Sequence, residues 1–323
     1  MLIKSFKQLD KKSVSEAGGK GASLGELTQA KIPVPPGFVV LAPSFERFIA
    51  ETDLDAEVEA ILKKVRPKDI NSVEQASEKI QGLILSAKMP QDIAEDIKKN
   101  FKKLVANPAP GASHRYGAGF VAVRSSATAE DGALAAWAGQ LDTFLNTTEK
   151  DLLKNVQKCW ASLFTPRAIF YRFEQKMHKS KVSVAVVVQA MVQSEISGIC
   201  FTVHPVTKDR NQMVIEAGFG LGEAIVSGSV TPDTYVVHKN DFSILDINVS
   251  EQSMMIVKSG SKNLHKKLSP QAGGKQKLMG RQIVELAKIC KNIEKHYKKP
   301  QDVEWAYVKG KFYITQSRPI TTL

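Results

Sequence analysis

Cysteines, a signal segment and long apolar runs are scarce or missing in this chain, and each absence excludes a class of protein. Three cysteines in 323 residues are too few and too widely spaced for a disulfide scaffold or a zinc site, and such usage is typical of a reducing compartment. They are Cys159, Cys200 and Cys290. The most apolar run, 182–192, is too short to cross a bilayer, and the first residues lack the apolar core of a signal peptide. We therefore expect a cytoplasmic protein with no membrane partner.

Acidic residues are also in the minority, with 33 Asp and Glu against 45 Lys and Arg, a net charge of +12. Much of the excess lies in lysine pairs on predicted helix surfaces, such as 63–64 and 102–103, and scattered pairs usually form a solvated face. No recognised nucleic-acid-binding motif accompanies the charge, so we expect no nucleic-acid partner. Docking to an acidic partner domain stays open.

Aromatic residues are few, at 7%, and glycine and proline are ordinary, which excludes collagen-like and disordered classes. A chain of 323 residues that is 43% apolar can bury a sizeable core, or two lobes. Helical spacing dominates the first half, at 13–27, 52–66, 72–87, 91–106, 149–163 and 166–176. Strand patterns dominate from Ser183 onward, and one long helix returns at about 277–297. The sequence predicts an α+β chain, with lobe one at approximately 1–188 and lobe two at approximately 189–323.

The last part of the chain holds two short apolar runs on either side of 309–311, a pattern that predicts a β-hairpin. Strand side chains alternate, so Asp302 shares a face with Glu304, and Gln316 shares a face with Arg318. A three-residue loop sets Glu304 opposite Gln316 and Asp302 opposite Arg318, whereas a two-residue turn sends these pairs to opposite faces. In the first register the hairpin presents carboxylates, an amide oxygen and a guanidinium together. Oxygen ligands suit Mg²⁺ and a guanidinium suits phosphate oxygens.

Two stretches in the first half could bind phosphate. Residues 18–25 place glycines and Lys20 at a helix start, where free N–H groups and the helix dipole favour an anion. The spacing is not that of a Walker A loop, and a glycine-rich turn with a surface lysine is the plain alternative. Arg124 ends a predicted strand and precedes two hydroxyl residues, an arrangement that could clamp phosphate oxygens or could be a helix cap with a structural ion pair.

Single residues in the middle of the chain suggest further contacts. Gln189 lies in a core strand that could also be a hinge whose backbone reads an adenine edge, with Met191 against the base. Thr202 could donate to a phosphate, whereas His204, beside a proline, fits a turn better than a catalytic role. Glu216 begins a glycine-rich loop and could reach a ribose or a metal, or help to cap the next helix.

Taken together, these stretches resemble the nucleotide-binding domain of the phosphoenolpyruvate synthase and pyruvate phosphate dikinase family. The resemblance is carried in order by 18–26, 34–38, 123–131, 138–140, 159–164, 220–223 and 316–319. The run 230–235 looks most like the phosphoenolpyruvate synthase type, and rifampicin phosphotransferases share much of the domain. The resemblance implies one ATP-grasp domain over 1–323, with ATP held between two lobes.

The resemblance also implies roles for single residues, with ATP and Mg²⁺ as cofactors. The triphosphate contacts and catalytic residues are Lys20, Arg124 and Arg318, of which Arg318 stabilises the transferred group. Thr202 lies on the phosphate side. The implied metal ligands are Glu304 and Gln316, with Asp302 beside them. The chain departs from the family at His204, where many relatives carry Asn, and at Trp137, where a smaller aromatic residue is common.

The implied activity is transfer of a (pyro)phosphoryl group from Mg-ATP to a histidine on a separate swivelling domain. A third domain then passes the group to pyruvate, giving phosphoenolpyruvate, AMP and phosphate. No histidine segment of that kind follows Arg318. We therefore expect the phosphohistidine and pyruvate-binding domains to come from another chain or a missing region. The alternatives are a dikinase subunit for another acceptor, such as rifampicin or a glucan, and an idle nucleotide-binding module.

Overall fold

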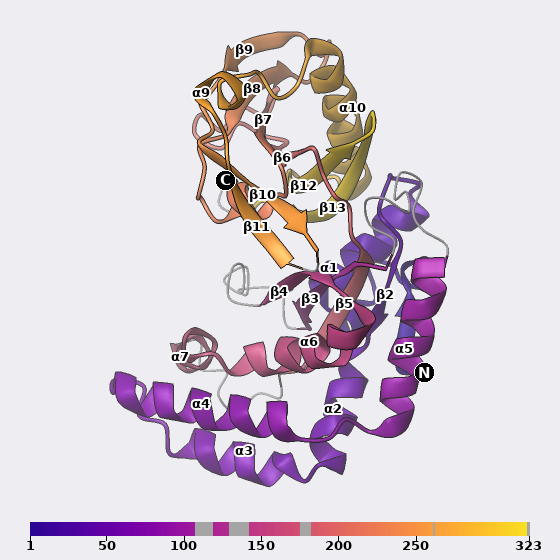
Figure 1. Ribbon diagram of the computed structural model, residues 1–323, viewed down its shortest axis with the longest axis vertical. Coiled ribbons are helices and arrows are strands. Elements are labelled where there is room, and N and C mark those ends of the chain that lie inside the picture. Colours follow the sequence, from indigo (N-terminus) through magenta and orange to yellow (C-terminus); the bar gives the residue numbers. More distant parts are fainter. Residues whose placement is uncertain (107–118, 129–141, 175–181, 261, 322–323) are drawn as a thin grey trace. The chain divides into compact units, whose positions relative to one another are not determined.

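The computed structural model describes residues 1–106, 119–128, 142–174, 182–260 and 262–321, and every structural statement below concerns these residues (Figure 1). They form mixed helices and antiparallel sheets, which confirms the α+β prediction. By contacts the chain divides into two compact units. Unit 1 comprises described residues of Met1–Gly25, Pro36–Asn107 and Gly119–Ala190, and unit 2 comprises those of Glu26–Pro35 and Met191–Leu323. The division therefore falls inside one helix, which the sequence pattern does not foresee.

Unit 1 is built on a five-stranded antiparallel sheet in the order β1-β2-β5-β3-β4. The strands are β1 Ile3–Ser5, β2 Gly37–Val40, β3 Val121–Ala127, β4 Thr143–Thr147 and β5 Val184–Ala190. The helices are α1 Val14–Gln29, α2 Ala42–Glu51, α3 Leu54–Lys63, α4 Ile70–Ser86, α5 Gln91–Ala106, α6 Glu149–Ala161 and α7 Pro166–Glu174. Two short 3₁₀ turns lie at Phe6–Gln8 and Ser162–Phe164.

The core of unit 1 lies on one face of this sheet. The α5 helix buries Ile93, Ile97 and Phe101, a spacing of four that aligns one apolar stripe along the helix. Trp160 of α6 is fully buried, with its ring centroid 4.9 Å from that of Phe48. The valines of β3 and β5 that alternate toward this side belong to the same cluster, so the helices cover a continuous apolar face.

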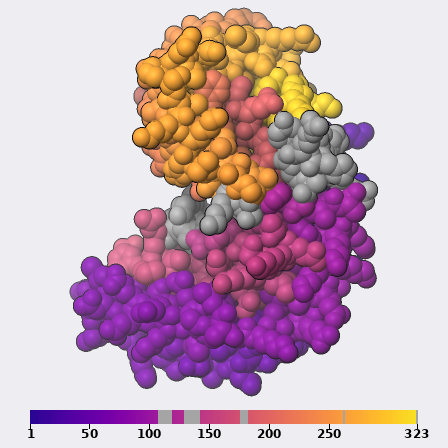
Figure 2. Space-filling model, viewed as in Figure 1, coloured from indigo at the N-terminus to yellow at the C-terminus, as the bar shows by residue number. Residues whose placement is uncertain are grey.

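Unit 2 is built on a six-stranded antiparallel sheet in the order β13-β12-β6-β7-β8-β9. The strands are β6 Ile196–Phe201, β7 Gln212–Phe219, β8 Asp233–His238, β9 Ile244–Asn248, β12 Gln301–Val308 and β13 Lys311–Pro319. Strands β10 Met254–Ser259 and β11 Lys262–Lys267 form a separate pair on the surface, within the orange region of Figure 2. The helices are α8 Glu223–Val226, α9 Pro270–Gly273 and α10 Gly280–Tyr297.

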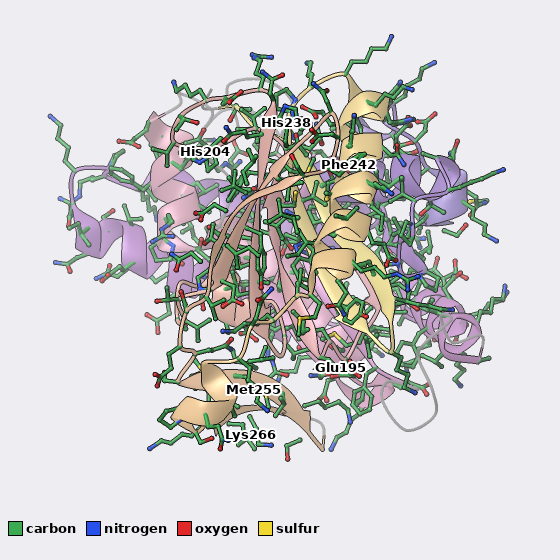
Figure 3. The ribbon with its side chains drawn as sticks, turned by 90° about the horizontal axis from the view of Figure 1, so that it is seen from above. Glu195, His204, His238, Phe242, Met255 and Lys266 are labelled. Carbon is green, nitrogen blue, oxygen red and sulfur yellow. The ribbon has the colours of Figure 1, made fainter. Side chains whose placement is uncertain are left out.

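One face of the six-stranded sheet packs on α10, which lies alongside the strands in Figure 3. The helix buries Ile283, Leu286, Ala287, Cys290 and Ile293, the apolar stripe expected from the sequence. The end of α1 contributes Leu27 to this core, and the N–H of Ile314 donates to the carbonyl of Pro33 at 2.8 Å. These contacts explain why the segment 26–35 belongs to unit 2.

The hairpin β12–β13 has the predicted cross-strand pairs but a different turn. Val308 pairs with Lys311, so the turn has two residues, Lys309 and Gly310, both with positive φ. Farther along, the register shifts at a bulge because Thr315 is an extra residue on β13. The bulge restores the pairs Glu304–Gln316 and Asp302–Arg318. Of the two turns that the sequence left open, the two-residue turn is present, and the bulge at Thr315 returns the pairs to one face, where that turn alone would have separated them.

A buried polar network anchors β8 in unit 2. The side chains of Asp233 and Lys277 are both fully buried, and Lys277 Nζ lies 2.8 Å from Asp233 Oδ1. Asp233 also accepts from the Tyr235 hydroxyl and from the N–H groups of Ser250 and Lys277. The run 230–235 that tips the resemblance toward phosphoenolpyruvate synthase therefore contributes to a structural network. No helix within the described ranges is both long and apolar enough to cross a bilayer.

Candidate nucleotide site

A kink in α1 brings two of the predicted phosphate-binding stretches together in unit 1. Gly18 has φ 67° and ψ 171°, so the helix breaks and starts again just before Lys20. The Ser126 hydroxyl donates to the carbonyl of Ala17 at 2.9 Å and accepts from the N–H of Gly21 at 3.2 Å. Both bonds are buried, and each joins segments more than a hundred residues apart in sequence. The start of the second helical segment of α1 is thereby held against β3.

Arg124 and Gln189 lie on the same face of the five-stranded sheet. Register pairs Arg124 with Val187 and Ala122 with Gln189, and alternation puts all four on the face opposite the helical core. Val39 on that face touches the α1 backbone at Gly21, so α1 covers this side. Arg124 is 9% exposed and Gln189 2% exposed. Unit 1 therefore gathers Lys20, Arg124 and Gln189 on one side of its sheet.

Cys159, at the end of α6, is not a reactive thiol in this environment. Burial raises its pKa to about 12, even though a hydrogen bond with the Ser125 side chain and the charge of Lys20 act to lower it. A thiol of that kind stays protonated at neutral pH and behaves as a small apolar side chain.

In unit 2 the predicted acidic and amide residues form cross-strand rows. One row runs across four strands through Glu216, Ile199, Glu304 and Gln316. The next row on the same face runs through Val214, Phe201, Asp302 and Arg318. The intervening residues face α10. We call the side that carries these rows the polar face of the six-stranded sheet.

Charges on the polar face interact. Arg318 Nε donates to Asp302 Oδ2 at 2.8 Å, and Arg318 Nη2 lies 2.8 Å from the same oxygen. Burial raises the pKa of Asp302, opposed by Arg318 and aided by Glu304. Burial also raises the pKa of Glu216, with the charge of Asp302 adding to the effect. Three carboxylates therefore share a partly buried region, where a bound cation would favour their charged forms.

The chemistry of these side chains fits a hard divalent cation. Glu304 and Gln316 supply a carboxylate and an amide oxygen from directly opposed positions, and oxygen donors are those that Mg²⁺ prefers. Within the described ranges, no group of three or more His, Cys, Asp or Glu side chains is arranged to hold a metal ion. An ion here would therefore need further oxygen ligands, of the kind that a triphosphate or water provides.

Some predicted residues lie away from these rows. Thr202 is fully buried, and its hydroxyl accepts from the N–H of Gln301 at 2.8 Å, so it does not lie open on the polar face. Met191 is 7% exposed and is the first residue of unit 2 after β5. Glu216 lies inside β7 and not in the loop in which we expected it. Trp137 lies outside the described residues.

His204 forms the predicted turn. It lies three residues after β6, and Glu195 directly precedes that strand; both residues are labelled in Figure 3. Its Nδ1 accepts from the N–H groups of Val206 at 3.3 Å and Thr207 at 3.2 Å. An asparagine side-chain oxygen makes the same kind of contact in turns. The histidine therefore acts as a side-chain acceptor for the backbone of its own turn.

Sequence reasoning missed Ser126 as the residue that joins α1 to β3. It was visible only as one of two small hydroxyl residues after Arg124, and nothing in the local pattern identified its distant partners. It also missed the role of Ile199, whose strand lies between those of Glu216 and Glu304. Strand order in a sheet is not readable from alternation alone.

Comparisons with known proteins identify the family of this chain. A family model described as pyruvate phosphate dikinase, AMP/ATP-binding domain, matches residues 14–323. A probable phosphoenolpyruvate synthase of Methanocaldococcus jannaschii is 48% identical over 318 residues, which are 98% of this chain and 26% of that protein. A probable phosphoenolpyruvate synthase of Methanothermobacter thermautotrophicus is 46% identical, over 98% of this chain and 46% of that protein.

A rifampicin phosphotransferase of Bacillus subtilis is also similar, at 39% identity over 100% of this chain and 36% of that protein. The chain thus spans between about a quarter and about half of the length of the relatives that it matches. The family model covers nearly all of it, including both α1 and the β12–β13 hairpin. The chain therefore belongs to the family of pyruvate phosphate dikinase AMP/ATP-binding domains, as its sequence resemblance predicted.

Proposed function

We propose that this chain binds Mg-ATP in an ATP-grasp-like, two-lobed manner and takes part in (pyro)phosphoryl transfer to a histidine of a separate domain. The observation that carries the proposal is the pair of rows on the polar face of unit 2. They join Glu216, Glu304 and Gln316 in one line and Asp302 with Arg318 in the next. Carboxylates for a metal and a guanidinium for phosphate, one row apart, suit a nucleotide triphosphate.

Each residue has a role in this proposal. Glu304 and Gln316 hold Mg²⁺, which neutralises phosphate charge when bound. Asp302 keeps the Arg318 guanidinium in place through the ion pair at 2.8 Å, and Arg318 stabilises the transferred group. Lys20 and Arg124 contact the triphosphate, supported by the α1 start that Ser126 holds against β3.

The remaining assignments concern the nucleoside, the metal shell and one phosphate contact. Gln189 and Met191 contact the base, and Glu216 contacts the ribose or the metal shell. The Thr202 hydroxyl accepts a hydrogen bond from the Gln301 N–H. It reaches a phosphate only by giving up that bond or by donating its own hydrogen to the phosphate. We keep it as a phosphate-side residue on the strength of the family pattern alone.

For the acceptor we propose a partner histidine that leads to phosphoenolpyruvate, with the other domains supplied from outside residues 1–323. The identities of 48% and 46% to probable phosphoenolpyruvate synthases, against 39% to a rifampicin phosphotransferase, favour that acceptor. Transfer to rifampicin is the second candidate. A glucan acceptor or an idle module has no specific observation in its favour.

Calorimetric titration of the chain with ATP, with and without Mg²⁺, tests the nucleotide site. We expect saturable binding that Mg²⁺ strengthens, and weaker Mg²⁺ dependence in Glu304→Ala. Absence of ATP binding in both conditions contradicts the proposal.

Arg318→Ala tests the role in transfer. We expect transfer to be abolished while ATP affinity stays within about tenfold, because a contact made in the transition state contributes little to ground-state binding. The measurement compares ATP affinity with phosphorylation of a supplied histidine domain. Equal losses in both would refute the role.

A further inference from the structure

Tyr313 on β13 has a buried hydroxyl with no partner in the part of the chain that the structure describes. The residue is 7% exposed, and the hydroxyl has no hydrogen-bond partner among the described residues. Burial raises the pKa of this phenol, so it remains a proton donor at neutral pH. Buried polar atoms without partners are unfavourable and rare in folded proteins.

The other two tyrosines on strands of the same sheet differ from Tyr313. The Tyr235 hydroxyl donates to Asp233 at 2.7 Å and accepts from the N–H of Leu278 at 3.0 Å. The Tyr307 hydroxyl accepts from Gln282 at 2.8 Å. Both belong to the side of the sheet that packs on α10. The described residues thus supply partners for the two hydroxyls on the packed side and none for that of Tyr313.

Register places Tyr313 on the polar face. It pairs with Ala306, and alternation along β12 puts Ala306 on the same face as Glu304 and Asp302. Tyr313 and Ala306 therefore form a third row on this face. It adjoins the row of Glu304, on the side away from the row of Arg318. Residues two apart on a strand are about 7 Å apart, roughly the distance from a phosphate to the sugar of a nucleotide.

We propose that the Tyr313 hydroxyl donates a hydrogen bond to the nucleoside half of the bound nucleotide, at a ribose oxygen or a base nitrogen. The inference rests on the proposed function, because Arg318 and Glu304 define the phosphate end of the polar face. The nucleoside of the same molecule then extends toward Ala306 and Tyr313.

The test uses Tyr313→Phe, which removes only the hydroxyl, with Tyr307→Phe as the matched control on the other face of the sheet. ATP and AMP are titrated into each protein without Mg²⁺, so that the metal contacts do not contribute. We expect Tyr313→Phe to lower the affinities for ATP and AMP by the same factor, about three- to tenfold, which is the effect of one lost hydrogen bond. Tyr307→Phe should leave both affinities unchanged.

Melting temperatures separate binding from structure. Tyr313→Phe should melt at the same temperature as the parent or higher, because the hydroxyl has no partner to lose, whereas Tyr307→Phe should melt lower. Unchanged affinities in Tyr313→Phe overturn the inference, and a loss for ATP alone overturns the nucleoside assignment. Parent protein that binds neither nucleotide, with Mg²⁺ added as well as without it, overturns the proposed function too, which distinguishes the two failures.

Discussion

The two units hold their candidate site residues by different physical means. In unit 1, Lys20 depends on a helix that breaks at Gly18 and is held to β3 by two buried bonds of Ser126. In unit 2, Glu304 and Gln316 face the same way because antiparallel register sets them opposite each other. Residues positioned by strand register are held in place by many backbone hydrogen bonds. Residues positioned by one helix kink and one hydroxyl depend on a few atoms. Single substitutions should therefore affect the two units differently.

The largest expected effect concerns stability in unit 2. Asp233→Ala leaves Lys277 charged and fully buried without its carboxylate, so we expect a loss of about 3–5 kcal/mol in the free energy of unfolding. Urea denaturation measures it. Arg47→Ala in unit 1 removes an exposed pair with Asp92 and should cost far less, because solvent screens exposed ion pairs. Similar losses in the two variants would contradict the contrast between buried and exposed pairs.

The next largest effect comes from a substitution that disrupts the helix start in unit 1. An added Cβ at Gly18 would lie 2.2 Å from Ser126 Oγ, and φ is +67° there, so Gly18→Ala is strained on both counts. We expect a loss of at least about 1 kcal/mol in unfolding free energy, together with weaker ATP binding. The control is Gly82→Ala in α4, where a Cβ meets nothing within 4 Å and should stabilise by about 0.4–1 kcal/mol. Normal ATP affinity in Gly18→Ala would show that the kink does not position Lys20.

A smaller effect concerns charge on the polar face of unit 2. Burial raises the pKa of Glu216 above 4.5, so the folded state disfavours the carboxylate. A raised folded-state pKa gives stability that is present below the unfolded pKa and lost as pH rises through the folded pKa. Glu216→Gln should therefore gain stability over the parent at neutral pH but not below pH 4.5. Unfolding free energies at both pH values measure this, and an equal difference at the two would indicate packing instead of charge.

The smallest effect concerns the turn after β6. His204→Asn keeps a side-chain acceptor for the N–H groups of Val206 and Thr207, so its melting temperature should match that of the parent. His204→Ala removes the acceptor and should cost roughly 0.5–1 kcal/mol. A destabilised His204→Asn with a normal His204→Ala would rule out the acceptor role.

Local patterns in the sequence were sufficient for several elements. The apolar stripe of 277–297 predicted α10, and alternation predicted β12 and β13 and the residues that share a face within each strand. Motif order predicted the family, which the match over 14–323 confirms. The sites themselves stay predictions, since no comparison tests which residues bind the nucleotide. These inferences succeed because side-chain periodicity is a property of one segment at a time.

By itself, then, the sequence determined the α+β class, the long helix, the faces of the hairpin and the family. Only the tertiary structure decided that Ser126 ties α1 to β3, that the bulge at Thr315 restores the pairing of Glu304 with Gln316, and that Thr202 is buried. It also decided that β6 lies between β7 and β12 and so joins Glu216 to Glu304 in one row. Each of these depends on contacts between segments far apart in sequence, which no local pattern contains.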